Sequence, residues 1–185
     1  MRIIAGRYGG RKLKTLDGLD TRPTSDKARG AIFNMLTQRV PGAMVLDLFA
    51  GSGAVGLEAV SRGARFAVLN DVSQRSIDII QDNVEKLGAQ DETGVMCKDA
   101  FLAVDVLADS GMVFDIIYID PPYDSGLYGE IILRIRERGI LALGGIIVCE
   151  HRKDSGFELP FDYRIYDRRI YGKSAVSFVI EEIVA

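Results

Sequence analysis

The sequence predicts one α/β domain built on an open, mostly parallel β-sheet that ends in an antiparallel hairpin. Between residues 44 and 149, apolar runs that suit strands alternate with stretches that suit helices. Several runs are apolar throughout, such as 116–119 and 146–148, which is typical of parallel strands buried on both faces. Near the C-terminus, two strand-like segments flank Gly172-Lys173-Ser174, and this arrangement predicts the hairpin.

The expected elements follow in order along the chain. Residues 3–15 predict a small hairpin around a glycine-rich turn at 6–10. Thr24 or Ser25 can cap a helix that runs through Leu36 and ends at Pro41-Gly42. Strands are then expected over Met44–Phe49, Phe66–Asn70, Gly94–Cys97, Phe114–Ile119 and Gly145–Cys149, and helices over Ala54–Arg62, Gln74–Leu87 and Leu127–Arg138. The closing hairpin is expected to pair Tyr163–Tyr171 with Ala175–Ile183.

A length of 185 residues fits a single domain. We expect residues 1–23 to form a basic hairpin arm with its loop, and residues 24–185 to form a Rossmann-like core. The N-terminus shows no apolar run of the length of a signal peptide or membrane span, so a cytoplasmic protein without membrane attachment is expected. Cys97 and Cys149 lie in apolar contexts and are expected to be buried free thiols. With a single histidine they cannot form the usual structural zinc site, and no metal is predicted.

Charge is distributed unevenly along the chain, whose formal net charge is −3. Residues 1–40 hold nine Lys or Arg against three Asp, which makes this segment +6 and the remainder −9. A basic arm on an acidic body indicates contact with a polyanion, although a solvated charged face would show the same composition. The arm and the helix after it contribute the candidate RNA-binding residues Arg2, Arg7, Arg11, Lys12, Lys14, Arg22 and Arg29.

A glycine-rich loop follows the first expected strand of the sheet. Gly51 and Gly53 allow a sharp turn and close approach of a ligand to bare backbone. The same glycines suit a dinucleotide-binding dehydrogenase, but Asp47 stands in the strand where such a fold would bury an apolar residue. A carboxylate there would suit the cationic amino group and sulfonium of S-adenosylmethionine and would be poorly placed against two phosphates. The loop therefore favours S-adenosylmethionine as the cofactor.

Two further carboxylates are expected at the same edge of the sheet, because the carboxyl ends of parallel strands meet there. Asp71 stands twenty residues after Gly51, a spacing that suits ribose hydroxyls, and Asp99 could bind the adenine amino group. Either residue could instead cap a helix, or do both. The predicted cofactor-binding residues are Asp47, Phe49, Ala50, Gly51, Ser52, Gly53, Asp71, Val72, Asp99 and Ala100.

The fourth expected strand ends in Asp120-Pro121-Pro122-Tyr123. Two prolines make a stiff, extended turn without N–H donors, so its acceptors are a carboxylate and carbonyls. This set suits methylation of an exocyclic base amine, whose lone pair is drawn into the ring. Asp120 and the Pro121 carbonyl would accept its two N–H groups, and Tyr123 would stack on the flipped base. An ordinary proline turn is the structural alternative, and the loop and the two acids on the same edge weigh against it.

These motifs resemble a known family. The segment from Asp47 to Gly53 together with Asp120-Pro121-Pro122-Tyr123 resembles amino-methylating nucleic-acid methyltransferases. The sequences at 2–6, 10–13, 22–26 and 29–34, and the closing 171–174 turn, are similar to the RsmD family of bacterial ribosomal RNA methyltransferases. This resemblance implies a class I methyltransferase fold of seven strands with the last antiparallel, and methylation of guanine N2 in 16S ribosomal RNA. The family's second-strand acid is often Glu, whereas Asp71 is shorter.

Three alternatives remain at this stage. A DNA adenine-N6 methyltransferase would use the same motifs, but no inserted target-recognition segment is seen. A catalytically idle RNA-binding protein could dispense with Asp120 and Gly51. A dehydrogenase would leave the 120–123 motif without a role. The expected substrate is 16S ribosomal RNA within a small-subunit particle or assembly intermediate, bound by a monomer.

Several polar residues are left without an assigned role in chemistry. His151 is expected at the edge of the sheet, exposed or hydrogen-bonded rather than a general base. Arg134, Arg136 and Arg138 suit a helix C-terminus. Arg168-Arg169 could contact phosphate or form a surface salt bridge with Asp167.

Overall fold

The computed structural model describes residues 1–16, 26–122 and 126–182. Its strands are β1 Met44–Asp47, β2 Phe66–Asp71, β3 Thr93–Cys97, β4 Phe114–Ile119, β5 Leu141–Arg152, β6 Tyr163–Tyr171 and β7 Ser174–Glu181. Its helices are α1 Asp26–Met35, α2 Ala54–Ser61, α3 Gln74–Leu87, α4 Ala100–Asp109 and α5 Tyr128–Arg138, with a short 3-10 helix η1 at Gln90–Glu92.

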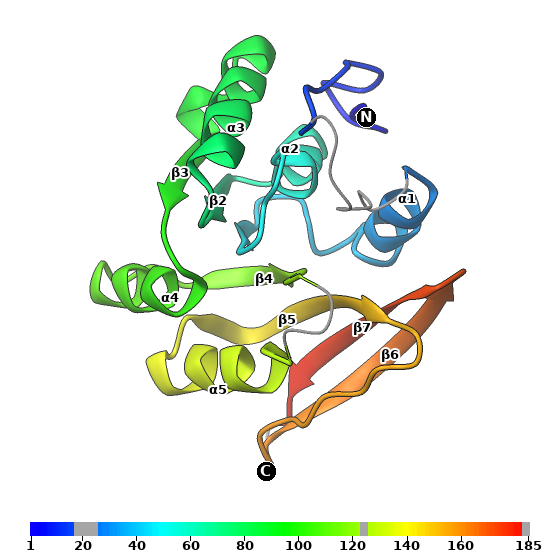
Figure 1. The fold of residues 1–185 in the computed structure, drawn as a ribbon, viewed down its shortest axis with the longest axis vertical. Coiled ribbons are helices and arrows are strands. Elements are labelled where there is room, and N and C mark those ends of the chain that lie inside the picture. Colours follow the sequence, from blue (N-terminus) through cyan, green and yellow to red (C-terminus); the bar gives the residue numbers. More distant parts are fainter. Residues whose placement is uncertain (17–25, 123–125, 183–185) are drawn as a thin grey trace.

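The strands form one seven-stranded sheet in the order β3-β2-β1-β4-β5-β7-β6 (Figure 1). Strands β1 to β5 pair in parallel, while β7 pairs antiparallel with both β5 and β6. The strand order reverses between β1 and β4, and in open α/β sheets the crevice at such a point, outside the carboxyl ends of the strands, is where ligands bind. The predicted fold class is confirmed, including the antiparallel C-terminal hairpin.

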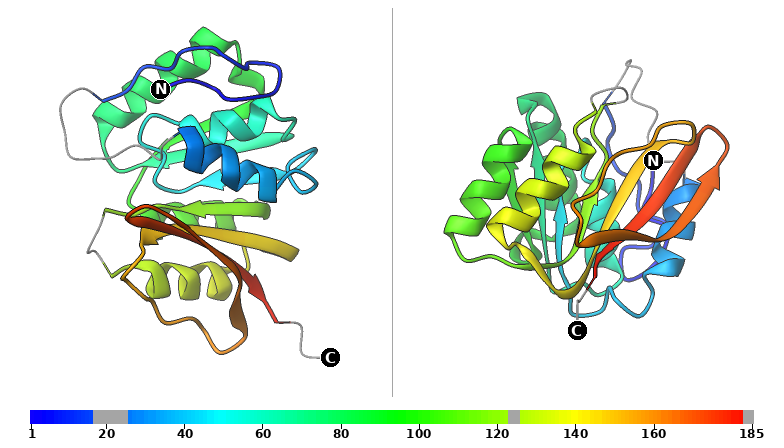
Figure 2. Two further views of the ribbon diagram at one scale, coloured as in Figure 1. Left: turned by 90° about the vertical axis from the view of Figure 1, so that its right-hand side faces the viewer. Right: turned by 90° about the horizontal axis from the view of Figure 1, so that it is seen from below.

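Helices cover both faces of the sheet (Figure 2). On one face α1, α2 and α3 pack over a core that includes Phe33, Leu57 and Ile80. On the other face α4 and α5 pack over Val104 and Ile131. Because both faces are covered, the central strands are apolar at nearly every position, which is the pattern that the sequence showed.

Two helices begin at side-chain caps. Ser73 accepts a hydrogen bond from the Ser76 N–H at the start of α3, and Gly88, with φ 69°, ends that helix. Asp99 caps α4 through the N–H groups of Phe101 and Leu102. These caps fix the first turns of both helices at the carboxyl edge of the sheet.

The structure differs from the sequence prediction at several elements. Helix α4 was expected only as a helix that Asp99 could cap, without stated bounds, because the exposed apolar residues Leu102 and Val106 obscure its amphipathic pattern. Strand β1 ends at Asp47 rather than at Phe49, since the chain turns into the glycine loop there. Strand β5 extends well beyond the predicted Gly145–Cys149, because its polar end pairs with β7 through Arg152. Cys97 is exposed rather than buried, whereas Cys149 is buried as predicted.

The N-terminal arm forms a hairpin, although its ladder is short. Arg2 and Lys12 make an isolated antiparallel bridge, and Ile3 N–H donates to the Arg11 carbonyl at 2.9 Å. The arm is attached to α2 by Glu58, whose carboxylate accepts the N–H groups of Ile4 at 2.7 Å and Ala5 at 3.1 Å. The arm is therefore part of the packed structure.

We expect Gly6→Ala to loosen this attachment more than Gly10→Ala does. Both glycines have positive φ, 82° and 83°, so an alanine costs about 1 kcal/mol at either position. A Cβ on Gly6 would lie 1.9 Å from the Ser61 carbonyl oxygen, whereas no atom lies within 4 Å of a Cβ on Gly10. The clash should cost about 1–3 kcal/mol more. Urea unfolding measures both costs, and equal values would contradict the packing of the arm against Ser61.

Among the described residues, no helix has the length and apolar character needed to cross a membrane.

Candidate active site

The loop after β1 is held by backbone hydrogen bonds to β2. Ala50 N–H donates to the Asn70 carbonyl at 2.8 Å, and Gly51 N–H donates to the Asp71 carboxylate, also at 2.8 Å. Gly53 N–H closes the turn on the Ala50 carbonyl at 2.7 Å. The predicted loop residues therefore lie together at the carboxyl ends of β1 and β2, in one ordered turn.

Two glycines, one in this loop and one in the helix that follows it, serve different purposes. Gly51 has φ 56°, and a Cβ built on it would meet no atom within 4 Å, so its backbone is open to a ligand. Gly56 lies in the first turn of α2, where a Cβ would lie 2.0 Å from a methyl carbon of Leu69. The first glycine leaves room for a bound molecule, and the second lets α2 pack closely on β2.

Asp47 lies beneath the loop and not on its open side. It is 1% exposed, and its carboxylate accepts the Gly56 N–H at 3.0 Å. Burial raises the pKa of Asp47 to about 7, the hydrogen bond from Gly56 opposes this rise, and the charge of Asp71 adds to it. Asp47 thus supports the start of α2 and keeps a titratable negative charge under the loop.

The other rim residues lie where the sequence placed them. Asp71 accepts the N–H groups of both Gly51 and Ser73, so it holds the loop and faces the edge of the sheet. Val72 is 71% exposed, an apolar side chain on the rim. Asp99 is exposed, and its Oδ1 accepts both bonds of the α4 cap, so its Oδ2 is left without a partner among the described residues. Ala100 is buried at the start of α4.

Asn83 of α3 joins the loop to the N-terminal arm. Its amide Nδ2 donates to the carbonyls of Ser52 at 2.9 Å and Lys14 at 3.0 Å, and its Oδ1 accepts the Lys14 N–H at 2.7 Å. The side chain is fully buried. Sequence reasoning missed this residue, although a polar side chain within the apolar stripe of a predicted helix is a usable signal.

The chain leaves β4 at the segment that was predicted to be reactive. Asp120 is half-buried, Pro121 is buried and Pro122 is exposed, while Tyr123 lies outside the described residues. Burial raises the pKa of Asp120 well above its ordinary value, and the negative charges of Glu150 and Asp47 raise it further. The carboxylates at the ends of β1 and β5 thus act on the carboxylate at the end of β4.

Glu150 is a second residue that the sequence analysis did not single out for a role. It is 4% exposed near the end of β5, next to Asp120 in the sheet register because Ile119 pairs with Cys149. The Tyr118 hydroxyl donates to its carboxylate at 2.6 Å, and the Tyr128 hydroxyl donates to its backbone carbonyl at 2.6 Å. These bonds hold a buried acid beside the predicted catalytic carboxylate.

One predicted RNA-binding residue is corrected by the structure. Arg29 is fully buried, where its Nε lies 3.7 Å from the Glu58 carboxylate and its guanidinium also pairs with Asp26. It cannot contact a polyanion without unpacking α1, because the carboxylate that anchors the arm also holds this cation. Arg22 lies outside the described residues.

The remaining arm cations are exposed, but most are already paired. Arg2 pairs with Asp26, Arg7 with Glu92 and Lys14 with Asp82, while Arg11 donates to the Leu87 carbonyl. Glu92 directly precedes β3, and Leu87 ends α3. Arg7 and Arg11 therefore lie toward the amino edge of the sheet, away from Asp120. Within residues 1–16, the two ends of the arm approach the glycine loop: the Ser52 hydroxyl contacts the Met1 sulfur at 3.7 Å, and Asn83 joins Ser52 to Lys14.

The residues left without a role behave as structural groups. Of the two states expected for His151, the hydrogen-bonded one is found: the residue is 2% exposed, and its ring bonds Ser177 and the Arg152 carbonyl, both at 2.8 Å. Burial lowers its pKa, so it is neutral at pH 7. Arg134, Arg136 and Arg138 form ion pairs with acids outside α5, namely Asp105 and Asp162. Their place near the helix C-terminus did not predict these ion pairs.

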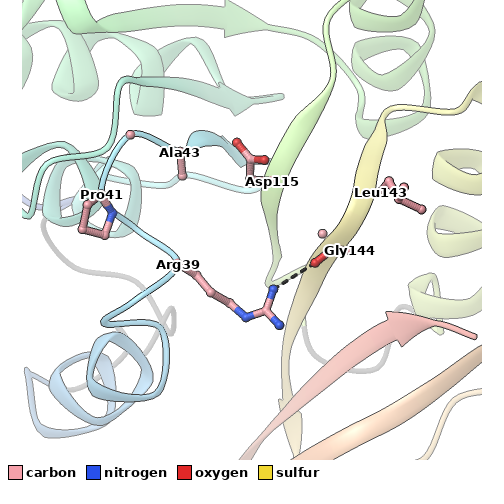
Figure 3. A pocket seen from close by; sticks show the side chains of 8 residues that line it. Arg39, Pro41, Ala43, Asp115, Leu143 and Gly144 are labelled. Atoms are coloured by element: carbon pink, nitrogen blue, oxygen red, sulfur yellow. Dashed lines mark hydrogen bonds between the residues drawn. The ribbon is translucent and has the colours of Figure 1, made fainter.

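A surface hollow at the amino edge of the sheet carries no site of its own. Arg39 crosses it to donate to the Gly144 carbonyl at 2.9 Å, as Figure 3 shows. The Asp115 carboxylate that lines it accepts the Met44 N–H at 2.8 Å. Its charged groups are thus engaged by the protein, and it lies at the opposite edge from Asp120.

The donor set at the carboxyl edge fits S-adenosylmethionine. Gly51 offers open backbone, Asp71 and Asp99 offer acceptors for ribose and adenine, and Val72 offers an exposed apolar surface. Asp47 adds negative charge beneath a loop that would face a cationic amino acid. Fold and site together define the class, an S-adenosylmethionine-dependent methyltransferase.

Comparison with known proteins agrees with this class and narrows it. The model of the family described as "Conserved hypothetical protein 95" matches residues 1–180, and the chain belongs to this family, in agreement with the resemblance to RsmD proteins. The chain is 34% identical over 176 residues to ribosomal RNA small subunit methyltransferase D of Escherichia coli K12, covering 95% of this chain and 87% of that one.

Solved structures show the same fold. A hypothetical protein of Thermus thermophilus is 31% identical over 99% of both chains, with a TM-score of 0.83. An S-adenosylmethionine-dependent methyltransferase of Agrobacterium tumefaciens is 22% identical, with a TM-score of 0.57 over 69% of this chain and 45% of that one. The second likeness concerns the fold alone.

Proposed function

We propose that this protein transfers the methyl group of S-adenosylmethionine to the N2 amino group of a guanine in small-subunit ribosomal RNA. The observation that carries this proposal is the position of Asp120-Pro121-Pro122 at the end of β4, directly across the strand-order reversal from the open loop of β1. The name of the E. coli relative supports the choice of ribosomal RNA. We further propose that the protein acts as a monomer in the cytoplasm, on a small-subunit particle or assembly intermediate.

Binding and orientation account for the chemistry at this edge. When bound, S-adenosylmethionine supplies a methyl group whose bond to sulfur breaks as the new bond to nitrogen forms. Asp120 and the Pro121 carbonyl accept the two N–H groups of the amine, which turns the nitrogen lone pair toward the methyl group. Tyr123 stacks on the flipped base. Once the new bond has formed, the nitrogen carries a surplus proton, and Asp120 is placed to take it.

The raised pKa of Asp120 suits this proton transfer. A carboxylate of ordinary acidity is a weak base at pH 7, whereas burial and the neighbouring Glu150 and Asp47 make Asp120 a stronger one. The Tyr118 hydroxyl keeps Glu150 in place through its 2.6 Å bond. Glu150 is therefore a positioning residue that acts through its charge on Asp120.

Methyl transfer from labelled S-adenosylmethionine tests the function, with small-subunit particles and 16S RNA from cells that lack this protein as acceptors. Nucleoside analysis should find N2-methylguanosine. Labelled N6-methyladenosine would agree with the mechanism but show that the target base is adenine. Label in DNA alone would indicate a DNA methyltransferase. Cofactor binding without any transfer would indicate an idle RNA-binding protein.

The arm is proposed to assist RNA binding through Arg2, Lys12 and Lys14, which lie at its ends nearer the loop. Lys12 is exposed and forms no ion pair within the described part of the chain. We expect Lys12→Gln to lower the slope of log affinity against log salt concentration by about 0.7–0.9, the value of one phosphate contact. Cofactor affinity should be unchanged. A slope equal to that of the wild type would show that Lys12 does not contact an RNA phosphate.

A further inference from the structure

A second group of cations lies at the carboxyl edge of the sheet, where β5 and the β6–β7 hairpin end. Lys153 follows β5, Lys173 forms the hairpin turn, and Arg168 lies near the end of β6. All three side chains are exposed. The Lys153 N–H donates to the Lys173 carbonyl at 3.0 Å, and the Arg168 guanidinium donates to the Lys153 carbonyl at 2.5 Å. A backbone bond and a side-chain bond thus hold these three residues next to one another, and we name this group the hairpin cluster.

The hairpin cluster is not neutralised, unlike most cations around it. None of its three side chains forms an ion pair with a carboxylate within residues 1–16, 26–122 and 126–182. Several other arginines of the C-terminal half have an acidic partner, as with Arg136 and Asp162 at 2.6 Å, Arg164 and Glu182 at 3.1 Å, or Arg169 and Asp167 at 2.7 Å. Like charges held together repel one another unless an anion binds. Because the rest of the chain is acidic, a group of cations without acidic partners is a local exception to the charge of the body.

The sheet register places the hairpin cluster beside the proposed catalytic edge. Strand β5 lies between β4 and β7, so the hairpin lies two strand spacings from β4, about 10 Å across the sheet. Asp120 lies level with Glu150, which pairs with Val176, and Lys173 lies three residues further toward the carboxyl edge, about 10 Å beyond that row. That separation is too large for the target base and suits the phosphates on either side of it.

Protection of a sheet edge is the simpler explanation for charges here, because edge strands often carry Lys or Arg that prevent pairing with other chains. It accounts for Arg168 on β6, the outer strand of the sheet. It does not account for Lys153 and Lys173, which lie outside the strands and at the catalytic end of the hairpin. We propose that the hairpin cluster of Lys153, Arg168 and Lys173 binds the RNA backbone that flanks the methylated nucleotide.

This inference rests on the proposed function, and it assigns the hairpin a larger part in RNA binding than the tip of the arm. The arm cations Arg7 and Arg11 lie toward the far edge of the sheet, and Arg7 is paired with Glu92. Phosphate contacts position a nucleic acid without reading its sequence. The hairpin cluster would therefore fix where the RNA strand lies, while the groups around Asp120 select the base.

The test compares Lys153→Gln/Lys173→Gln with Arg39→Gln/Arg65→Gln, a control that removes the same charge from exposed cations at the amino edge. Filter binding to small-subunit particles and to deproteinised 16S RNA is measured over a range of salt, together with methyl transfer. We expect the cluster variant to bind both acceptors about tenfold more weakly at low salt, with a salt slope lower by about 1.4–1.8. Its KM should rise while kcat and cofactor affinity stay near those of the control.

Each other outcome decides a separate point. Equal affinities and slopes for the two variants would overturn the proposal and leave the proposed function intact. Weaker binding to particles but not to deproteinised RNA would assign the cluster to a ribosomal protein and also overturn it. If the wild type binds RNA but transfers no methyl group, the proposed function fails, while the two affinities still test the cluster. A wild type that binds neither acceptor overturns both.

Discussion

Asp120→Asn is expected to lower the rate of methyl transfer by about 10²–10³-fold while cofactor affinity stays near that of the wild type. The variant amide can accept one N–H group, but it carries no charge and cannot take the proton that leaves the methylated nitrogen. Cofactor affinity should survive, because the loop bonds to Asn70 and Asp71 do not involve Asp120. Single-turnover transfer and calorimetric titration of the cofactor measure the two quantities separately.

Asp115→Asn is the matched control, since Asp115 lies near the opposite end of the same strand and is exposed. It should transfer methyl groups at a near wild-type rate. If Asp120→Asn turns over as fast as this control, Asp120 has no part in the reaction.

The same site predicts a pH dependence. Only ionised Asp120 accepts a proton, and burial and the charge of Glu150 raise its pKa, so activity should fall as the pH is lowered, at a higher pH than for an ordinary carboxyl group. Glu150→Gln keeps an acceptor for the Tyr118 hydroxyl but removes the charge, so the midpoint of this fall should move to lower pH. An unmoved midpoint would show that Glu150 serves packing alone.

Asp47→Asn is expected to change how stability depends on pH. Burial raises the pKa of Asp47 to about 7, and the charge of Asp71 adds to this against the bond from Gly56. The folded state therefore gains stability from a protonated Asp47 at low pH, and this gain is lost as the pH rises from about 4 through 7. Between pH 4.5 and pH 8, the free energy of unfolding of the variant should rise relative to that of the wild type by up to about 3 kcal/mol.

Urea unfolding at pH 4.5, 6 and 8 measures this difference, with Asp115→Asn as the exposed control. The comparison across pH matters more than the stability at any one pH, because an asparagine amide in this buried position has a constant cost of its own. A difference between variant and wild type that does not change with pH would show that Asp47 titrates as an ordinary carboxyl group. Saturating S-adenosylmethionine should reduce the difference, since its cationic groups favour ionised Asp47.

Local sequence signals were sufficient for the fold, and they placed most of the predicted site residues at one edge of the sheet. Apolar runs at 116–119 and 146–148 predicted doubly covered parallel strands, and the turn at Gly172 predicted the closing hairpin. Gly51 was predicted from the glycine loop and Asp71 from its spacing of twenty residues after it, and the structure joins them by a 2.8 Å hydrogen bond. Such signals succeed because the carboxyl ends of parallel strands always meet at one edge.

Contacts between distant segments lay beyond such signals. Nothing near Asn83 or Glu58 in sequence shows that these two side chains anchor an arm more than fifty residues away. The same holds for Arg29, which sequence assigned to the surface with the other arm cations and tertiary packing buried against Glu58.

What the sequence determined by itself was the class of fold, and it predicted the cofactor loop and the segment 120–123 as the site, because each depends on residues that are close together in the chain. Tertiary structure alone decided which charges are available. It paired Arg7 with Glu92, buried Asp47 and left Lys153 and Lys173 side by side without an acidic partner among the described residues. The reason is physical: the state of a charge depends on burial and on neighbours within a few ångströms, and those neighbours come from every part of the chain.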